Sequence, residues 1–133
     1  MIVRRRSKLA ALALVAAGPL LAHHSFSLEF DATKRVSFQG VVTKVEWVNP
    51  HVYFYLDVKE GPTKVVNWVF EGAGPIALER RGWNRNTLKI GDQITVIGYR
   101  AKDEVQVASA REVVLADGRK MIAASPNDGG PQF

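Results

Sequence analysis

Residues 51–58 read HVYFYLDV, and their side chains alternate between apolar and polar types. Successive side chains of a β-strand point to opposite faces, so this alternation predicts a strand with one buried face and one wetter face. The four apolar residues of even number share the buried face, and the other face carries His51, Tyr53, Tyr55 and Asp57. A period of two limits this part of the chain to a sheet.

Similar patterns occur before and after this segment. Residues 35–48 alternate around Gly40, and an isolated glycine in such a run indicates a β-bulge or a sharply coiled strand. Further strands are predicted over 64–71 and 93–100. Residues 105–123 predict a fifth strand and a hairpin at Asp117-Gly118.

One short helix is predicted between the third and fourth strands, over residues 76–81. Pro75 suits its first turn and Gly82 suits its end. Three strands, a short helix and two more strands give the order of an OB-fold, a five-stranded partly open barrel. Another small β-barrel or a β-sandwich is the alternative.

The N-terminus has the composition of a secretory signal peptide. Arg4, Arg5, Arg6 and Lys8 precede the apolar residues 9–22, a run too short to span a bilayer comfortably. We expect cleavage after Ala22, which makes the protein periplasmic or secreted with no stable membrane anchor. An uncleaved anchoring helix is the alternative.

Cleavage there divides the chain into four parts. Residues 1–22 are the signal peptide and 23–34 a lead-in to the domain. Residues 35–123 form the β-domain, and 124–133, rich in Pro, Gly and Asn, form a flexible tail.

The charge and the composition exclude several functions. Of 18 Lys and Arg, four lie in residues 1–22, so the mature chain carries 14 against 13 acids. Such near-neutrality and the exported compartment argue against nucleic acid as a partner. Without cysteine, disulfides and thiolate metal sites are excluded. No G-x-S-x-G, H-E-x-x-H or phosphate-loop motif occurs, so we expect no enzyme of these classes.

Several strings, found together, carry a family resemblance. They are AHHSF, GVVTKVEWVNPH, RRGWNRNTLKIGD, GYRAKD and LADGRK, and they cover essentially the whole mature chain. With them the sequence resembles a family of small exported bacterial proteins classed as a domain of unknown function. The resemblance implies export and a small β-domain, and it leaves the activity open.

The three histidines suggest a metal site. Cleavage after Ala22 makes His23 N-terminal, and its α-amine and imidazole Nδ1 can chelate one ion. A third nitrogen from His51, or else from His24, gives a T-shaped set that suits Cu(II). This arrangement resembles the histidine brace of exported copper proteins. Glu46 and Asp57 could supply oxygen ligands.

The metal site has a plain alternative. In it, the two adjacent histidines only begin a flexible N-terminus, and His51 forms a hydrogen bond within its turn.

Two other groups are candidate ligand-binding residues. Tyr53 and Tyr55, with Trp47 and Trp68 on neighbouring strands, could form an aromatic binding face, or the tryptophans could fill the core. A second group could bind an anionic ligand, or its arginines could pack over the tryptophan at a solvated helix end: Arg80, Arg81, Trp83 and Arg85.

Two functions follow from these residues. The first is an exported module that binds copper through its histidines. The second is a metal-independent accessory module that binds an envelope protein or a small ligand.

Overall fold

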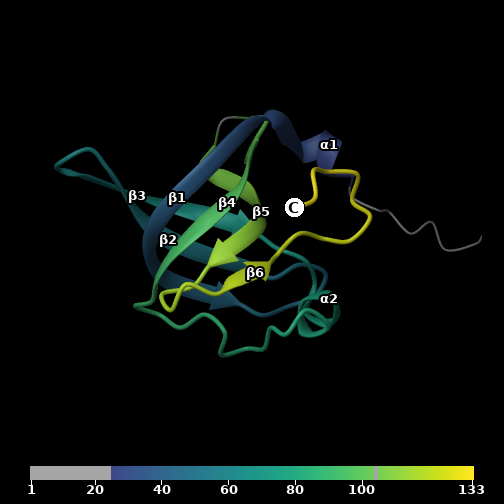
Figure 1. The fold of residues 1–133 in the computed structure, drawn as a ribbon. Coiled ribbons are helices and arrows are strands. Elements are labelled where there is room, and N and C mark those ends of the chain that lie inside the picture. Colours follow the sequence, from purple (N-terminus) through teal and green to yellow (C-terminus); the bar gives the residue numbers. More distant parts are fainter. Residues whose placement is uncertain (1–24, 104) are drawn as a thin grey trace, which may run out of the picture.

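The structure, a computed structural model, describes residues 25–103 and 105–133. This part of the chain contains two short helices and six strands (Figure 1). In chain order they are α1 (Phe26–Glu29), β1 (Phe30–Glu46), β2 (Tyr53–Glu60), β3 (Lys64–Glu71), α2 (Pro75–Glu79), β4 (Gln93–Ala101), β5 (Val107–Val114) and β6 (Lys120–Ile122). Neither helix of the described residues is long and apolar enough to cross a membrane.

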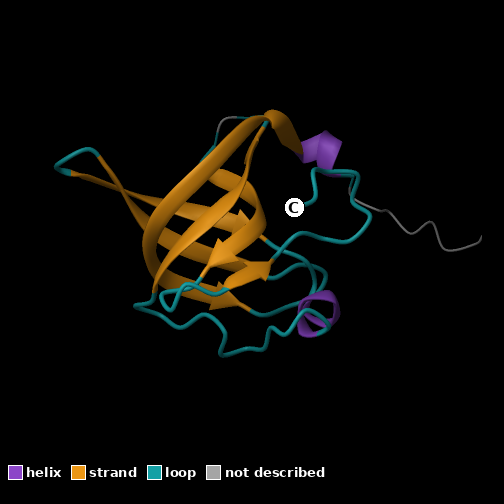
Figure 2. Cartoon of the chain, viewed as in Figure 1, coloured by secondary structure: helices purple, strands orange, loops and turns teal. Residues whose placement is uncertain are grey.

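The strands form one sheet in the order β3-β2-β1-β4-β5-β6 (Figure 2). Neighbours in this order pair antiparallel. The sheet also curls until β3 pairs in parallel with β5, through Val69–Glu71 and Val107–Ser109. The predicted mainly β class is confirmed, but the sheet has six strands rather than five. The extra strand arises because the predicted hairpin at Asp117-Gly118 returns β6 against β5.

The apolar face of each strand points into the curled sheet. The alternation predicted for β2 is confirmed: Phe54, Leu56 and Val58 are buried, whereas Tyr53 and Tyr55 are half-buried and Asp57 is exposed. Further members of the core come from every part of the sheet: Val42, Trp68, Phe70, Ile94, Val96, Ala108, Ala110 and Val113.

The first strand is longer than predicted and bends elsewhere. It begins at Phe30, so part of the expected lead-in is strand. Its bulge relative to β2 lies at Thr43, between Val42 and Lys44, and not at Gly40. Gly40 meets a different need, because a β-carbon there would lie 2.6 Å from the carbonyl oxygen of Asp57.

The predicted helix is present with slightly different ends. It covers Pro75–Glu79 rather than 76–81, with proline in its first turn. Gly82 follows with a φ of 89°, a left-handed conformation that favours glycine after a helix. The other helix, α1, lies within the expected lead-in and was not predicted.

Gly98→Ala is expected to lower the free energy of unfolding by about 3 kcal/mol. A β-carbon at Gly98 would overlap the carbonyl oxygen of Ser109, and two paired backbones cannot separate as a side chain could. Urea denaturation measures the change. Gly72→Ala is the matched control, because its β-carbon would find its nearest neighbours at 3.5 Å. Equal stability of the two variants would contradict the prediction.

Candidate metal site

A cavity of about 560 Å³ lies where both ends of the described chain meet the sheet. Its walls come from four places: Ser25 to Phe30 around α1, the loop before β2, the end of β3, and residues 125–129 near the C-terminus. Ser109 of β5 adds a hydroxyl. The cavity therefore joins segments that are distant in sequence.

His51 is held in the wall of this cavity by hydrogen bonds between the loop and the end of β3. The amide of Gly72 donates to the carbonyl of Val52 at 2.8 Å, and the amide of Val52 donates to Ala73 at 3.0 Å. Val52 itself is buried. These contacts fix the backbone on which the imidazole stands.

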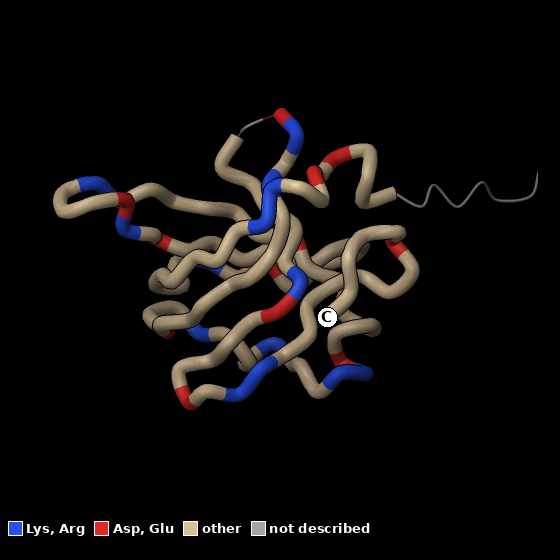
Figure 3. The backbone as a smooth tube through the Cα atoms, turned by 45° about the horizontal axis from the view of Figure 1, so that its top comes forward, with Lys and Arg blue, Asp and Glu red and all other residues tan. Residues whose placement is uncertain are grey.

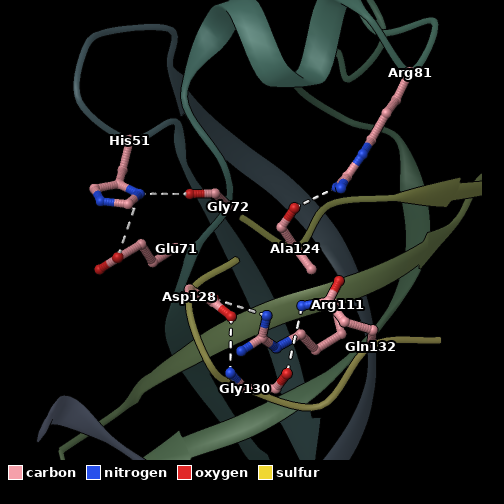
Figure 4. Close-up of polar contacts among 9 residues, drawn as sticks. All are labelled: His51, Glu71, Gly72, Arg81, Arg111, Ala124, Asp128, Gly130 and Gln132. Carbon is pink, nitrogen blue, oxygen red and sulfur yellow. Dashed lines mark hydrogen bonds and ion pairs between the residues drawn. The ribbon is translucent and has the colours of Figure 1, made fainter. Parts of the chain in front are cut away.

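One nitrogen of the His51 ring contacts the end of β3 (Figure 4). Its Nδ1 lies 3.0 Å from the carbonyl oxygen of Gly72 and 3.5 Å from Oε1 of Glu71. A carbonyl can only accept, so Nδ1 carries the hydrogen and donates it. In the neutral ring, Nε2 then keeps its lone pair. A metal-bound histidine is held in this way, by a hydrogen bond from its other nitrogen.

Glu71 is a candidate functional residue of this site that the sequence analysis missed. It faces Tyr53 across the β2–β3 ladder, and the Tyr53 hydroxyl donates to its Oε2 at 3.4 Å. Its other oxygen is the one near His51. The register of the predicted hairpin could have revealed Glu71, since it lies opposite a residue two positions from His51.

The phenol of Tyr53 is expected to titrate near pH 12. Burial chiefly, and then the charge of Glu71, raise its pKa to about 12, because both disfavour the phenolate. Glu71→Gln should lower this pKa while leaving it above 10, since burial persists. Ultraviolet titration of the wild type and of Tyr53→Phe isolates the signal. Tyr55, hydrogen-bonded to Glu46, is the matched control, and its titration should not respond to Glu71→Gln.

The two carboxylates proposed as oxygen ligands lie elsewhere. Glu46 accepts a hydrogen bond from Tyr55 at 3.0 Å and pairs with Lys44, and these contacts lower its pKa. Asp57 accepts from Asn67 at 2.8 Å. Neither residue lines the cavity that contains His51.

His23 and His24 lie outside the described residues. Ser25, the first residue described, lines the same cavity as His51. Among residues 25–103 and 105–133, no group of three metal-ligating side chains could hold an ion. Among the described residues, the candidate metal site therefore consists of His51 as a candidate ligand and Glu71 as its neighbour.

The aromatic candidates are used within the fold. Trp68 is buried in the core with its ring tilted against that of Phe38, and Trp47 is partly buried and packs against that core. Tyr53 and Tyr55 remain half-buried and donate to glutamates. The interpretation of the tryptophans as core residues agrees with this placement.

The candidate residues of the arginine-rich segment after α2 differ in their burial. Trp83 is buried and donates from its indole nitrogen to Ile122 at 2.9 Å, so it is not accessible to a ligand. Arg81 donates to the carbonyl of Ala124. Arg80 and Arg85 are exposed. In the view of Figure 3, acidic and basic residues are interspersed along the backbone.

The segment expected to be a flexible tail contacts the rest of the domain. Asp128 forms an ion pair at 2.8 Å with Arg111, whose side chain is fully buried (Figure 4). The amide of Phe26 donates to the carbonyl of Asp128 at 2.9 Å. The two ends of the described chain are therefore hydrogen-bonded to each other beside the cavity.

A family model matches residues 11–109 of the chain. The chain belongs to this family of unknown function, DUF6152. The family resemblance predicted from the sequence motifs is thereby confirmed. The DUF6152 match includes all three histidines and Glu71, and it ends before Arg111 and Asp128. No curated protein and no solved structure matches the sequence.

Proposed function

We propose that this DUF6152 protein is an exported metal-binding module that holds Cu(II) through His23 and His51. In the proposal, cleavage after Ala22 frees the α-amine of His23, which chelates the ion together with its own imidazole. Nε2 of His51 is the third nitrogen, with His24 as its substitute. Three nitrogens in a T-shape suit Cu(II), which prefers tetragonal nitrogen sites and binds most tightly in the divalent series.

The state of His51 carries the proposal. Its Nδ1–H is engaged by the carbonyl of Gly72, which leaves Nε2 as the metal-binding atom. The carboxylate of Glu71 near Nδ1 makes the imidazole more basic and therefore a stronger metal ligand.

The distance along the chain is compatible with the proposal. His23 precedes Ser25 by two residues, and an extended chain spans about 7 Å over that length. Ser25 and His51 line one cavity. The N-terminal amine of a chain cut after Ala22 is thus within reach of it.

The type of barrel and the cellular compartment are also part of the proposal. We propose that the curled sheet is a barrel of the OB type. The long β1, which pairs with both β2 and β4, and the parallel contact of β3 with β5 support this proposal. The basic and apolar composition of residues 1–22 supports export by a signal peptide.

Titration of the mature protein, residues 23–133, with Cu(II) tests the proposal. We expect one ion per chain and an electron paramagnetic resonance spectrum with nitrogen hyperfine structure. His51→Ala should lower the affinity about 100-fold, and Glu71→Gln about 10-fold, because outer partners tune the metal ligands. Glu46→Gln is the matched control for Glu71→Gln, because it also removes a tyrosine-bound carboxylate.

The third ligand is decided by comparing two variants. His24→Ala should bind Cu(II) as the wild type does. Equal affinities of the wild type and of His51→Ala would refute the role of His51. Failure of the mature wild type to bind one ion per chain would refute the proposed function.

A further inference from the structure

A buried arginine lies under both ends of the described chain. Arg111 occupies a β-bulge of β5, since Ile97 and Gly98 of β4 pair with Glu112 and Ala110 on either side of it. A bulge redirects the side chain of its extra residue. The guanidinium of Arg111 is fully buried, and its Nε and Nη2 have no hydrogen-bond partner among the described residues.

Two contacts hold this guanidinium, one from each chain end. Nη1 donates to Oδ2 of Asp128 at 2.8 Å. The carbon of the guanidinium lies 4.4 Å from the centre of the Phe26 ring, within the range of a cation–π contact. Arg111 is therefore one point at which the N-terminal and C-terminal segments are both joined to the sheet.

The two segments also contact each other tightly. The amide of Phe26 donates to the carbonyl of Asp128, and the amide of Gly130 donates to Oδ1 of the same aspartate. A β-carbon at Gly130 would overlap Nη2 of Arg111 and approach the Phe26 ring to 2.6 Å. The C-terminal segment lies over the guanidinium with no room for a side chain at that glycine.

Residues 25–30 are also attached to the sheet through Lys102, which follows β4. The amide of Lys102 donates to the carbonyl of Glu29 at 2.9 Å, and its ammonium group donates to the carbonyl of Ser27.

Phe26 and Phe30 belong to a small apolar cluster with Tyr99 and Ala101, which is separate from the main core. The rings of Phe26 and Phe30 stack at 5.6 Å, and that of Tyr99 meets Phe26 edge-on at 5.8 Å. The position of Ser25 at the cavity thus depends on Lys102, on this cluster and on the C-terminal segment.

We infer that residues 125–130 are a positioning segment for the metal site, which act through Asp128 and Arg111 to hold the N-terminal segment beside His51. The inference rests on the proposed function. The same C-terminal residues form one wall of the cavity that contains His51, so the clamp and the site share a boundary. In this inference Asp128 and Arg111 are positioning residues, which act on the site through Phe26 and the N-terminal segment.

Asp128→Asn in the mature protein tests this inference. It keeps the Oδ1 acceptor for Gly130 and removes the charge that faces Arg111. In the metal-free protein, hydrogen exchange should show the Phe26 amide exchanging as in an unfolded chain, while the Val96 amide of β4 stays protected. The Cu(II) affinity should fall about 100-fold, as in His51→Ala, and the paramagnetic spectrum should become that of His51→Ala.

Asp117→Asn is the matched control. Asp117 also accepts from a backbone amide two residues ahead and from an arginine, Arg119, but in the exposed hairpin. It should change neither the Phe26 amide nor the affinity. A double-mutant cycle distinguishes this positioning role from a general loss of structure. Asp128→Asn should lower the Cu(II) affinity of the wild type and leave the Cu(II) affinity of His51→Ala unchanged.

The outcomes separate the two proposals. A mature wild type that does not bind Cu(II) refutes the proposed function, and this inference with it. A wild type that binds normally, with an Asp128→Asn variant that frees the Phe26 amide but keeps affinity and spectrum, refutes this inference alone. Deletion of residues 125–133 is the second variant. If the Phe26 amide stays protected after that deletion, the positioning role is also refuted.

Discussion

Acetylation of the α-amine of His23 is expected to lower the Cu(II) affinity of the mature protein about 100-fold or more. The proposed chelate needs the α-amine and the imidazole Nδ1 on the same residue, so that the second bond closes a small ring. Acetylation converts that amine into an amide and leaves the N-terminus with no amine to anchor the ion. An added residue would not give the same result, because its own amine and the imidazole of His24 would form another tight Cu(II) chelate.

Isothermal titration of the acetylated and native mature proteins measures this effect. Amidation of the carboxylate of Phe133 is the control, because it also removes one terminal charge. Both modified proteins should unfold at the same urea concentration as the native chain. If acetylation leaves affinity and spectrum unchanged, the α-amine is no ligand and any copper site has another composition.

The strands could be predicted because they bury only one face. In β2 and β3, apolar side chains recur at every second position, and the predicted range of β3, 64–71, is that of the structure. The ends of β1 could not be predicted in this way. Residues 31–35 are mostly exposed, and the strand extends through them because Phe30 and Arg35 on either side of an irregular stretch pair with β4, which is distant in sequence.

The candidate site shows the same limit. His51 could be proposed from its chemistry alone, because the chain has only three histidines. Glu71 could not be proposed from its residue type, since glutamate is common, and only the register of the β2–β3 hairpin brings it to His51 and Tyr53. Glu46 and Asp57 were proposed from nearness in sequence, but their contacts with Tyr55 and Asn67 lie away from the cavity.

The composition of the C-terminal segment predicted a flexible tail, whereas in the structure this segment contacts the rest of the domain. Proline, glycine and asparagine are typical of mobile chain ends, and residues 124–133 contain all three. Here Gly130 is required by the close approach to Arg111, and Asp128 by the charge of that residue. Neither requirement can be predicted from the sequence, because arginine is almost never fully buried and nothing in the sequence marks Arg111 as an exception.

Asp128→Asn is expected to lower the free energy of unfolding by about 3 kcal/mol, because removing one partner of a buried pair leaves an uncompensated charge. Here that charge is the guanidinium of Arg111, which is fully buried, whereas the side chain of Asp128 is 14% exposed. Arg111→Met should therefore cost less, since the carboxylate left behind reaches water and the methionine fills similar space under Phe26. Urea denaturation of both variants measures the difference.

The double variant Arg111→Met, Asp128→Asn should recover most of the loss caused by Asp128→Asn alone. It contains no buried charge, and apolar replacements of buried pairs are often neutral for stability. Arg119→Met, which removes an exposed arginine from its pair with Asp117, is the control and should leave the urea midpoint almost unchanged. If the two single losses simply add in the double variant, the guanidinium and the carboxylate are not coupled, and the ion pair does not hold the C-terminal segment to the sheet.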